Sequence, residues 1–174
     1  MIELSKLKLL KPTDEINPNY KMPFDEFCET AKKVLPNFPE DVLSQWPYEN
    51  YTFFLDFANQ GMKYDEFTFK KESWNLGRIL EIQDPSKYFE NGIGHFIIDN
   101  EFETDLSRYM REYRTWPRPI IVFDTIRSKT DGTYPFEKPY HLLEGHMRFA
   151  LLKHMIQVKW DIPNTHIVWV ATQE

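Results

Sequence analysis

The fold is decided by the stretch Trp116-Pro-Arg-Pro-Ile-Ile-Val-Phe123 and by a second stretch, Tyr140-His-Leu-Leu-Glu-Gly-His-Met-Arg148. The first ends in four apolar residues, three of them β-branched, which is the composition and length of a buried strand. The second begins with a comparable strand, Tyr140–Leu143, and we expect a turn at Asp131-Gly132 between the two. Over residues 146–155 apolar side chains recur at helical spacing, so the predicted order is strand, loop, strand and helix.

Further elements are expected on both sides of this stretch. The apolar residues of Ile2–Leu10 alternate with mainly polar ones at a period of two, which predicts a strand. Helical spacing predicts helices over residues 24–35 and 102–113. The predicted fold class is therefore α+β, a small mixed sheet flanked by helices, with strands at Ile2–Leu10, Ile120–Asp124, Tyr140–Leu143 and Ile167–Thr172.

The middle of the chain, residues 38–100, is expected to be a mainly helical insertion within a single domain that spans residues 1–174. This insertion is rich in aromatic residues between Trp46 and Trp74. Such a density can form a stacking platform for bases, but it is more often a core combined with a partner surface. We therefore interpret most of these aromatic side chains as core.

Composition and charge exclude several classes of protein. The chain has 21 Lys and Arg against 27 Asp and Glu, a net charge of −6, which disfavours a general nucleic-acid ligand. Its single cysteine, Cys28, excludes an intramolecular disulfide framework and a multi-cysteine zinc cluster. Charged residues interrupt the N-terminal apolar stretch, and no run of about 18 apolar residues follows. We therefore expect a cytoplasmic protein with no membrane partner.

The junction between the second strand and its helix is the best candidate for a binding site. Gly145 permits a tight turn, and the first amide groups of the new helix point outward without helical partners, which suits an anion. Arg148 lies in that first turn, and its forked guanidinium suits a phosphate oxygen. The alternative is that Gly145 only turns the chain while Arg148 pairs with a carboxylate such as Glu144 or Asp124.

Three motifs in this order resemble the ParB/sulfiredoxin-like superfamily: Pro119-Ile-Ile-Val122, Asp131-Gly132 and Glu144-Gly-His-Met-Arg-Phe-Ala150. Residues 2–9 and 106–119 are similar to its first strand and to the helix that leads into the first motif, so the resemblance covers about half of the chain. It implies a pocket for nucleotide phosphates, with ATP or CTP and Mg²⁺ as cofactor. The residues it implies for this pocket are Glu144, Gly145, His146 and Arg148.

The resemblance also implies a phosphotransferase or a nucleotide hydrolase. The serine kinases of the superfamily use a catalytic glutamate in the loop after the first strand, where this chain has Glu15. Glu15 and His146 are therefore the candidate catalytic residues, and a solvated carboxylate without a catalytic role is the alternative for Glu15. In the sulfiredoxins a reactive cysteine occupies the position of His146, so we exclude sulfinic-acid reduction.

The remaining histidines give weaker signals. No two of them have the i, i+4 spacing with a flanking glutamate that a zincin helix needs, so we expect no protein-bound metal site. Asp124, directly after a strand, is a candidate Mg²⁺ contact.

A second hypothesis is a non-catalytic interaction protein of the immunity or antitoxin type. It would retain the scaffold and bind a protein partner through the acidic, aromatic insertion, because negative charge suits a basic partner and exposed aromatic side chains anchor interfaces. This hypothesis predicts no nucleotide binding, whereas the first predicts nucleotide affinity that falls on Arg148→Ala.

Overall fold

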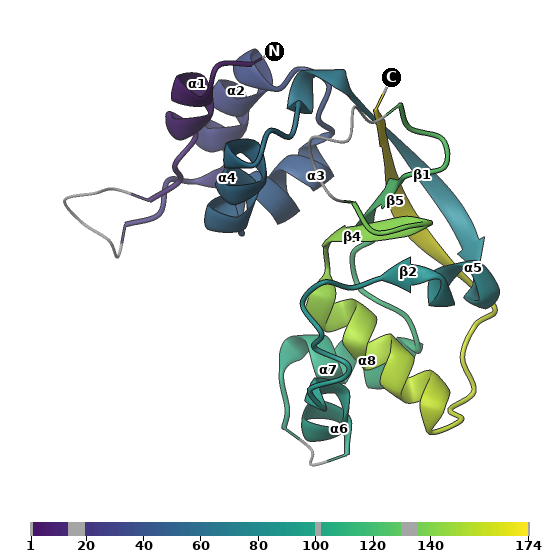
Figure 1. Cartoon of the computed structure of the whole chain (residues 1–174). Helices are drawn as coiled ribbons and strands as arrows, with labels where there is room; N and C mark the ends of the chain where they lie inside the picture. The colour runs from purple at the N-terminus through teal and green to yellow at the C-terminus, as the bar shows by residue number, and fades with distance from the viewer. Residues whose placement is uncertain (1, 14–19, 100–101, 130–135, 174) are drawn as a thin grey trace. The chain divides into compact units, whose positions relative to one another are not determined.

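The computed structural model describes residues 2–13, 20–99, 102–129 and 136–173 (Figure 1). Glu15 and the Asp131-Gly132 turn lie outside these described residues. The chain divides into two compact units. Unit 1 comprises Met1–Phe69, Arg127–Pro135 and Thr172–Glu174, and unit 2 comprises Lys70–Ile126 and Phe136–Ala171.

The described residues form helices and a mixed sheet of five strands, which confirms the α+β class. The helices are α1 (Leu4–Lys8), α2 (Phe24–Val34), α3 (Glu40–Leu43), η1 (Ser44–Tyr48), α4 (Tyr51–Asn59), η2 (Tyr64–Glu66), α5 (Leu76–Leu80), α6 (Ile93–Ile98), α7 (Asp105–Tyr113) and α8 (His146–Gln157). The strands are β1 (Phe67–Asn75), β2 (Ile82–Gln83), β3 (Ile120–Asp124), β4 (Tyr140–Glu144) and β5 (Thr165–Gln173).

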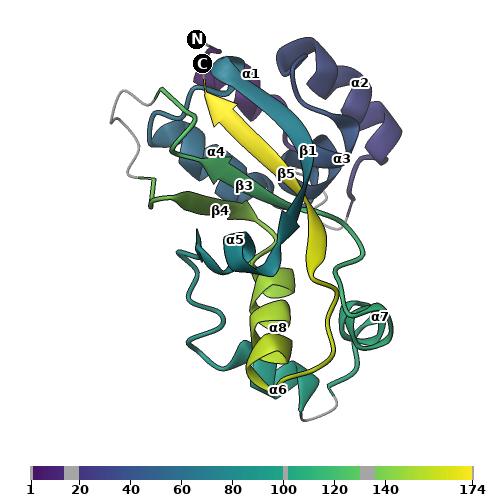
Figure 2. The same cartoon turned by 90° about the vertical axis from the view of Figure 1, so that its right-hand side faces the viewer.

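The sheet has the strand order β1-β5-β3-β4-β2, and Figure 2 shows β3 between β5 and β4. Strand β3 pairs parallel to β5 and antiparallel to β4, with Val122 opposite Val170 on one side and Leu142 on the other. All five residues of β3 are buried, as the continuous apolar run predicts for a central strand. The predicted strands at 120–124 and 140–143 and the helix that follows them are confirmed.

The prediction of a strand over Ile2–Leu10 is wrong, because this segment contains helix α1. A period of two would place Leu7 and Leu9 on one face, but Leu7 is 3% exposed and Leu9 is 75% exposed. Leu10, three residues after Leu7, is also buried, and this is the spacing of one helical turn. The short segment contained both periods, and the tertiary packing selected the helical one.

The stretch 38–100, expected to be a mainly helical insertion, also supplies both outer strands of the sheet, β1 and β2. Phe67 and Phe69 alternate with Thr68, and β-branched and aromatic residues favour a strand over a helix. Half of the ten aromatic side chains between Trp46 and Trp74 are core: Trp46, Phe54, Tyr64, Phe67 and Trp74 are at most 1% exposed, whereas Phe53 is 63% exposed.

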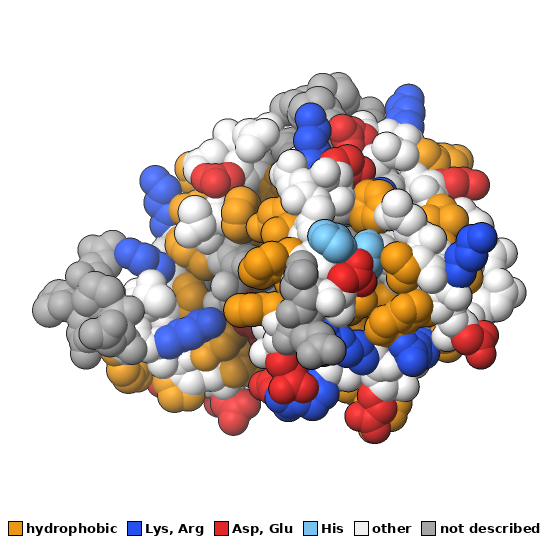
Figure 3. All heavy atoms as spheres, turned by 90° about the horizontal axis from the view of Figure 1, so that it is seen from below, with side chains coloured by type: hydrophobic (Ala, Val, Ile, Leu, Met, Phe, Trp, Pro, Cys, Tyr) orange, Lys and Arg blue, Asp and Glu red, His pale blue; other side chains and the backbone are white. Residues whose placement is uncertain are grey.

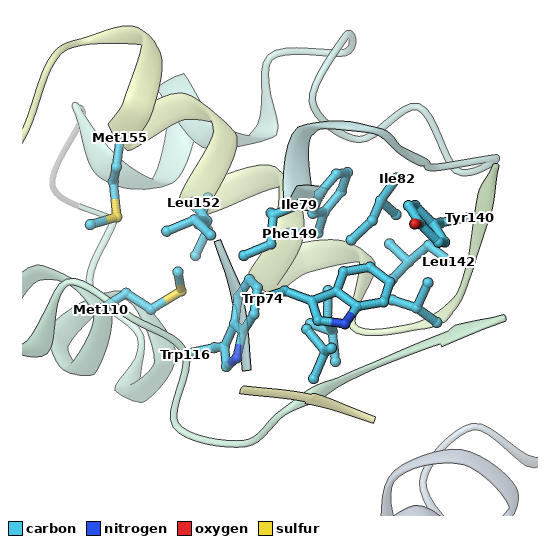
Figure 4. Close-up of a cluster of buried hydrophobic side chains, with 14 of the residues drawn as sticks. Trp74, Ile79, Ile82, Met110, Trp116, Tyr140, Leu142, Phe149, Leu152 and Met155 are labelled. Carbon is cyan, nitrogen blue, oxygen red and sulfur yellow. The ribbon is translucent and has the colours of Figure 1, made fainter. Parts of the chain in front are cut away.

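The core of unit 2 forms between the sheet and helix α8 (Figure 4). Leu152 and Met155 of α8 lie toward Met110 of α7 and Trp116, while Phe149 lies toward Trp74. Complete burial of one such side chain stabilises the fold by roughly 1.5–3 kcal/mol. Helix α8 is therefore held firmly along its length, and it is the element that carries the histidines discussed below.

Among the described residues, no helix has both the length and the apolar character required to cross a lipid bilayer.

Candidate functional site

The first residue of α8, His146, follows a glycine whose shape fixes the turn. Gly145 has a φ of 101°, a left-handed conformation that costs little only for glycine. A Cβ atom at this position would also lie 2.5 Å from Cγ2 of Ile120 in β3. The prediction that Gly145 allows close backbone approach is therefore confirmed, and the start of α8 is positioned against the central strand.

The partner of His146 is Asp84, a residue that the sequence analysis did not single out as functional. Strands β2 and β4 are parallel, so their carboxyl ends meet at one edge of the sheet, where ligands of open α/β sheets commonly bind. Asp84 follows β2, and His146 follows β4 after Gly145. Nδ1 of His146 lies 2.6 Å from Oδ1 of Asp84.

Burial and charge give this pair a defined protonation pattern. The Asp84 side chain is 2% exposed, whereas that of His146 is 23% exposed. Burial acts to raise the pKa of Asp84, but hydrogen bonds from His146 and Ser86 outweigh it and lower that pKa. The ionised carboxylate can only accept, so Nδ1–H of His146 donates to it, and Nε2 is the ring nitrogen that this contact does not use.

A second histidine, His141 in β4, is buried near this pair. Burial, followed by the charge of His146, lowers the pKa of His141 to about 4. Its Nδ1 accepts a hydrogen bond from the backbone N–H of Glu137 at 3.2 Å. His141 is therefore neutral near pH 7 and is a packed residue of the sheet, while the His146 side chain is partly exposed.

Arg148 has partners within the protein. Nη1 of Arg148 donates to the backbone carbonyl of Arg118 at 2.8 Å, and Nη2 of Arg148 lies 3.6 Å from Oε1 of Glu144. Of the two carboxylates considered for it, Glu144 is the one that Arg148 contacts. These contacts brace the first turn of α8 against the segment before β3, and its role as a phosphate ligand stays a prediction.

Asp124 also has a cationic partner, because its Oδ2 lies 3.4 Å from Nη2 of Arg78. Its other oxygen accepts a hydrogen bond from the backbone N–H of Ile126. The guanidinium of Arg78 is stacked over Trp74, 3.8 Å from the ring centroid. The described geometry thus gives Asp124 a structural ion pair and does not fit the Mg²⁺ contact that we considered for it.

The structure brings together a further group of titratable residues near the other end of α8. His154 of this helix lies beside Asp99, which in turn contacts His95. The sequence analysis tested the histidines against a zincin pattern and therefore missed this group. The signal that could have found it is the i, i+4 spacing of His95 and Asp99.

The candidate site residues predicted from the sequence thus divide into two groups. Glu144, Gly145, His146 and Arg148 gather at the start of α8, and Asp84, the residue after β2, contacts His146 there. Glu15 lies outside the described residues, so its catalytic role stays a prediction.

Comparisons of the chain with family sequence models, with curated proteins and with solved structures found no match. The likeness to the ParB/sulfiredoxin-like superfamily accordingly remains an interpretation of the motifs.

Proposed function

We propose that this protein binds a phosphate ester, with a nucleoside triphosphate as the first choice, at the start of α8 and transfers a proton there through His146. The observation that carries the proposal is the Asp84–His146 pair: a buried, ionised carboxylate orients a partly exposed imidazole at the carboxyl ends of two parallel strands. This arrangement is the one that general-base catalysis by histidine requires.

The anion would be held by the backbone of α8. This helix has 12 residues, and no side chain caps its N-terminus. The first N–H groups of any helix have no helical acceptor, and here no side chain accepts from them either. The helix dipole adds partial positive charge at the same place. Arg148 fixes the first turn to the carbonyl of Arg118, and in this proposal its charged guanidinium also donates to a phosphate oxygen.

His146 would act on the nucleophile. Its Nε2 accepts the proton of a water molecule or a hydroxyl group as the oxygen attacks the terminal phosphorus, and the bond from phosphorus to the leaving nucleoside diphosphate breaks. The imidazolium that forms is stabilised by Asp84, 2.6 Å from Nδ1. Glu15 is proposed as an alternative base toward a hydroxyl substrate.

Mg²⁺ supplies charge neutralisation on the phosphates when it is bound with the nucleotide. The described carboxylates around His146 already face other groups: Asp84 faces His146, and Glu144 faces Arg148. Mg²⁺ would therefore be bound mainly by the nucleotide's own oxygens.

The test is calorimetric titration of the full chain with ATP, ADP and CTP, each with Mg²⁺, followed by measurement of phosphate release. Arg148→Ala should weaken nucleotide binding about tenfold or more, since loss of a charged donor costs roughly 1.5–3 kcal/mol. His146→Gln should keep binding and slow phosphate release by roughly 100-fold or more. Asp84→Asn should slow release with little change in affinity.

Arg108→Ala is the matched control, because Arg108 is an exposed arginine of α7 and its loss removes the same charge. It should leave both readouts unchanged. Absence of binding heat with all three nucleotides would overturn the proposal and favour the interaction hypothesis. Equal phosphate release by His146→Gln and wild type would refute the role of His146.

A further inference from the structure

A group of three side chains, His95, Asp99 and His154, joins helix α6 to α8. Helix α6 lies against α8 because Gly94 permits it: a Cβ atom at Gly94 would lie 2.4 Å from Cβ of His154. The close approach places His95 and Asp99, one turn apart at the end of α6, over the buried ring of His154. Figure 3 shows histidine side chains next to an acidic one on this exposed face.

The three side chains converge through the carboxylate of Asp99. Its Oδ2 lies 2.6 Å from Nδ1 of His95, and both of its oxygens lie 3.0 Å from Nε2 of His154. One ligand atom from each residue can be chosen so that all three lie within 4.8 Å of one another. Two imidazole nitrogens and one carboxylate oxygen, each able to bind a metal ion, thus lie close together.

We propose that this cluster binds a divalent transition-metal ion, with Zn²⁺ as the expected occupant. Two histidines and a carboxylate form a donor set that zinc and ions of similar chemistry accept, and three protein ligands leave a position open for water. The absence of a thiolate at the cluster disfavours soft ions such as Cu(I).

The present distances fit this proposal after a small adjustment. Two ligands each about 2.0–2.1 Å from a tetrahedral ion lie roughly 3.3 Å apart. The separations of Asp99 from His95 and His154, 2.6 and 3.0 Å, are therefore shorter by about 0.7 and 0.3 Å. His95 and Asp99 are 66% and 36% exposed, so solvent lies on one side of both and the proposal requires them to shift outward, while His154 is 9% exposed and is fixed by packing.

A cavity of about 470 Å³ adjoins the cluster and is open to solvent. Asp99 itself lines it, together with Ile98, Glu103, Arg111 and Trp160. Arg111 holds this end of α6 in place, because its Nη2 donates to the carbonyls of Ile97 and Ile98 at 2.9 and 3.0 Å. The ion would therefore enter through this cavity, and the coordination position that no protein ligand fills would face the cavity.

The test uses the full chain after treatment with a chelator. Calorimetric titration with Zn²⁺ should show one ion per chain, and Co²⁺ in its place should give the visible absorption of a low-symmetry site with nitrogen and oxygen ligands. His95→Gln and Asp99→Asn should each weaken Zn²⁺ binding by more than the roughly 10–100-fold that loss of a supporting contact around a metal ligand costs. Both positions are exposed, so the variants should fold.

His146→Gln is the matched control. His146 also faces a carboxylate at 2.6 Å, but that pair has one imidazole where the cluster has two. This variant should bind Zn²⁺ as tightly as wild type. Equal Zn²⁺ affinity of wild type, His95→Gln and Asp99→Asn would overturn the proposal, and so would a stoichiometry well below one. The cluster would then be a hydrogen-bonded His–Asp–His group only.

Discussion

The two His–Asp groups of α8 use the same residue types and differ in the burial of the carboxylate. Asp84 is 2% exposed and meets one imidazole, whereas Asp99 is 36% exposed and meets two. Hydrogen bonds from His154 and His95 lower the pKa of Asp99, and for Asp84 the hydrogen bonds must also overcome burial. A buried carboxylate with one histidine orients a base, and an exposed one shared by two offers a ligand set.

The largest expected effect is a difference in stability between variants of two glycines, Gly145 and Gly92, which precede helices α8 and α6. Gly145 and Gly92 both have positive φ, but a Cβ atom meets Ile120 at Gly145 and nothing within 4 Å at Gly92. Gly145→Ala adds overpacking to backbone strain and should lower the free energy of unfolding by about 3 kcal/mol or more. Gly92→Ala should cost about 1 kcal/mol, from strain alone. Urea unfolding of both variants measures this difference, and equal losses would contradict it.

The next prediction concerns acid sensitivity near the Asp84–His146 pair. The folded-state pKa of His141 is about 4, below its ordinary value of 6.5, so the unfolded chain binds a proton more readily. His141 therefore contributes fully to stability above pH 6.5, and this contribution falls as the pH drops from 6.5 to 4, by up to about 3 kcal/mol.

His141→Gln removes this titration and should flatten the pH dependence of the free energy of unfolding in that window. The other histidines are present in both proteins, so the difference between the two urea-unfolding profiles isolates His141. Parallel profiles between pH 6.5 and pH 4 would show that the prediction is wrong.

The smallest expected effect concerns Gly94, which lets α6 pack closely on α8 beside the His95–Asp99–His154 cluster. Gly94→Ala forces α6 away from α8 and should lower the free energy of unfolding by about 1–3 kcal/mol while weakening Zn²⁺ binding. Gly77→Ala in α5 is the control, since its nearest neighbour is Oδ1 of Asn75 at 3.4 Å, an ordinary contact. The control should be neutral or slightly stabilising. Unchanged Zn²⁺ affinity in Gly94→Ala would show that the cluster does not depend on the close packing of α6 on α8.

The sequence patterns predicted the elements whose signal is local. Strands β3 and β4 contain short apolar runs and helix α8 has apolar residues at helical spacing, so their ends could be placed closely. Strand β2 has two residues, too few for any period, and it forms because β4 offers it a parallel edge. Asp84 could not be recognised as a site residue because its position depends on that pairing.

The same reasoning explains what was found of the two groups. Gly145 and His146 are neighbours in sequence and were predicted together. Asp84 and His146 are separated by 62 residues, and Asp99 and His154 by 55, so only the tertiary fold joins them. The i, i+4 pair of His95 and Asp99 was visible locally, but a metal site needs a third ligand that no local pattern supplied.

The outer strands of the sheet bear on how the protein behaves at high concentration. An unpaired strand edge is a template for pairing with another chain, and proteins protect such edges with short strands or lysines. One outer strand, β2, spans only Ile82–Gln83, and the other, β1, carries exposed Lys70 and Lys71 at its centre. Both edges are therefore poor templates for intermolecular strand pairing, so this sheet resists edge-to-edge aggregation although its central strand β3 is almost entirely apolar.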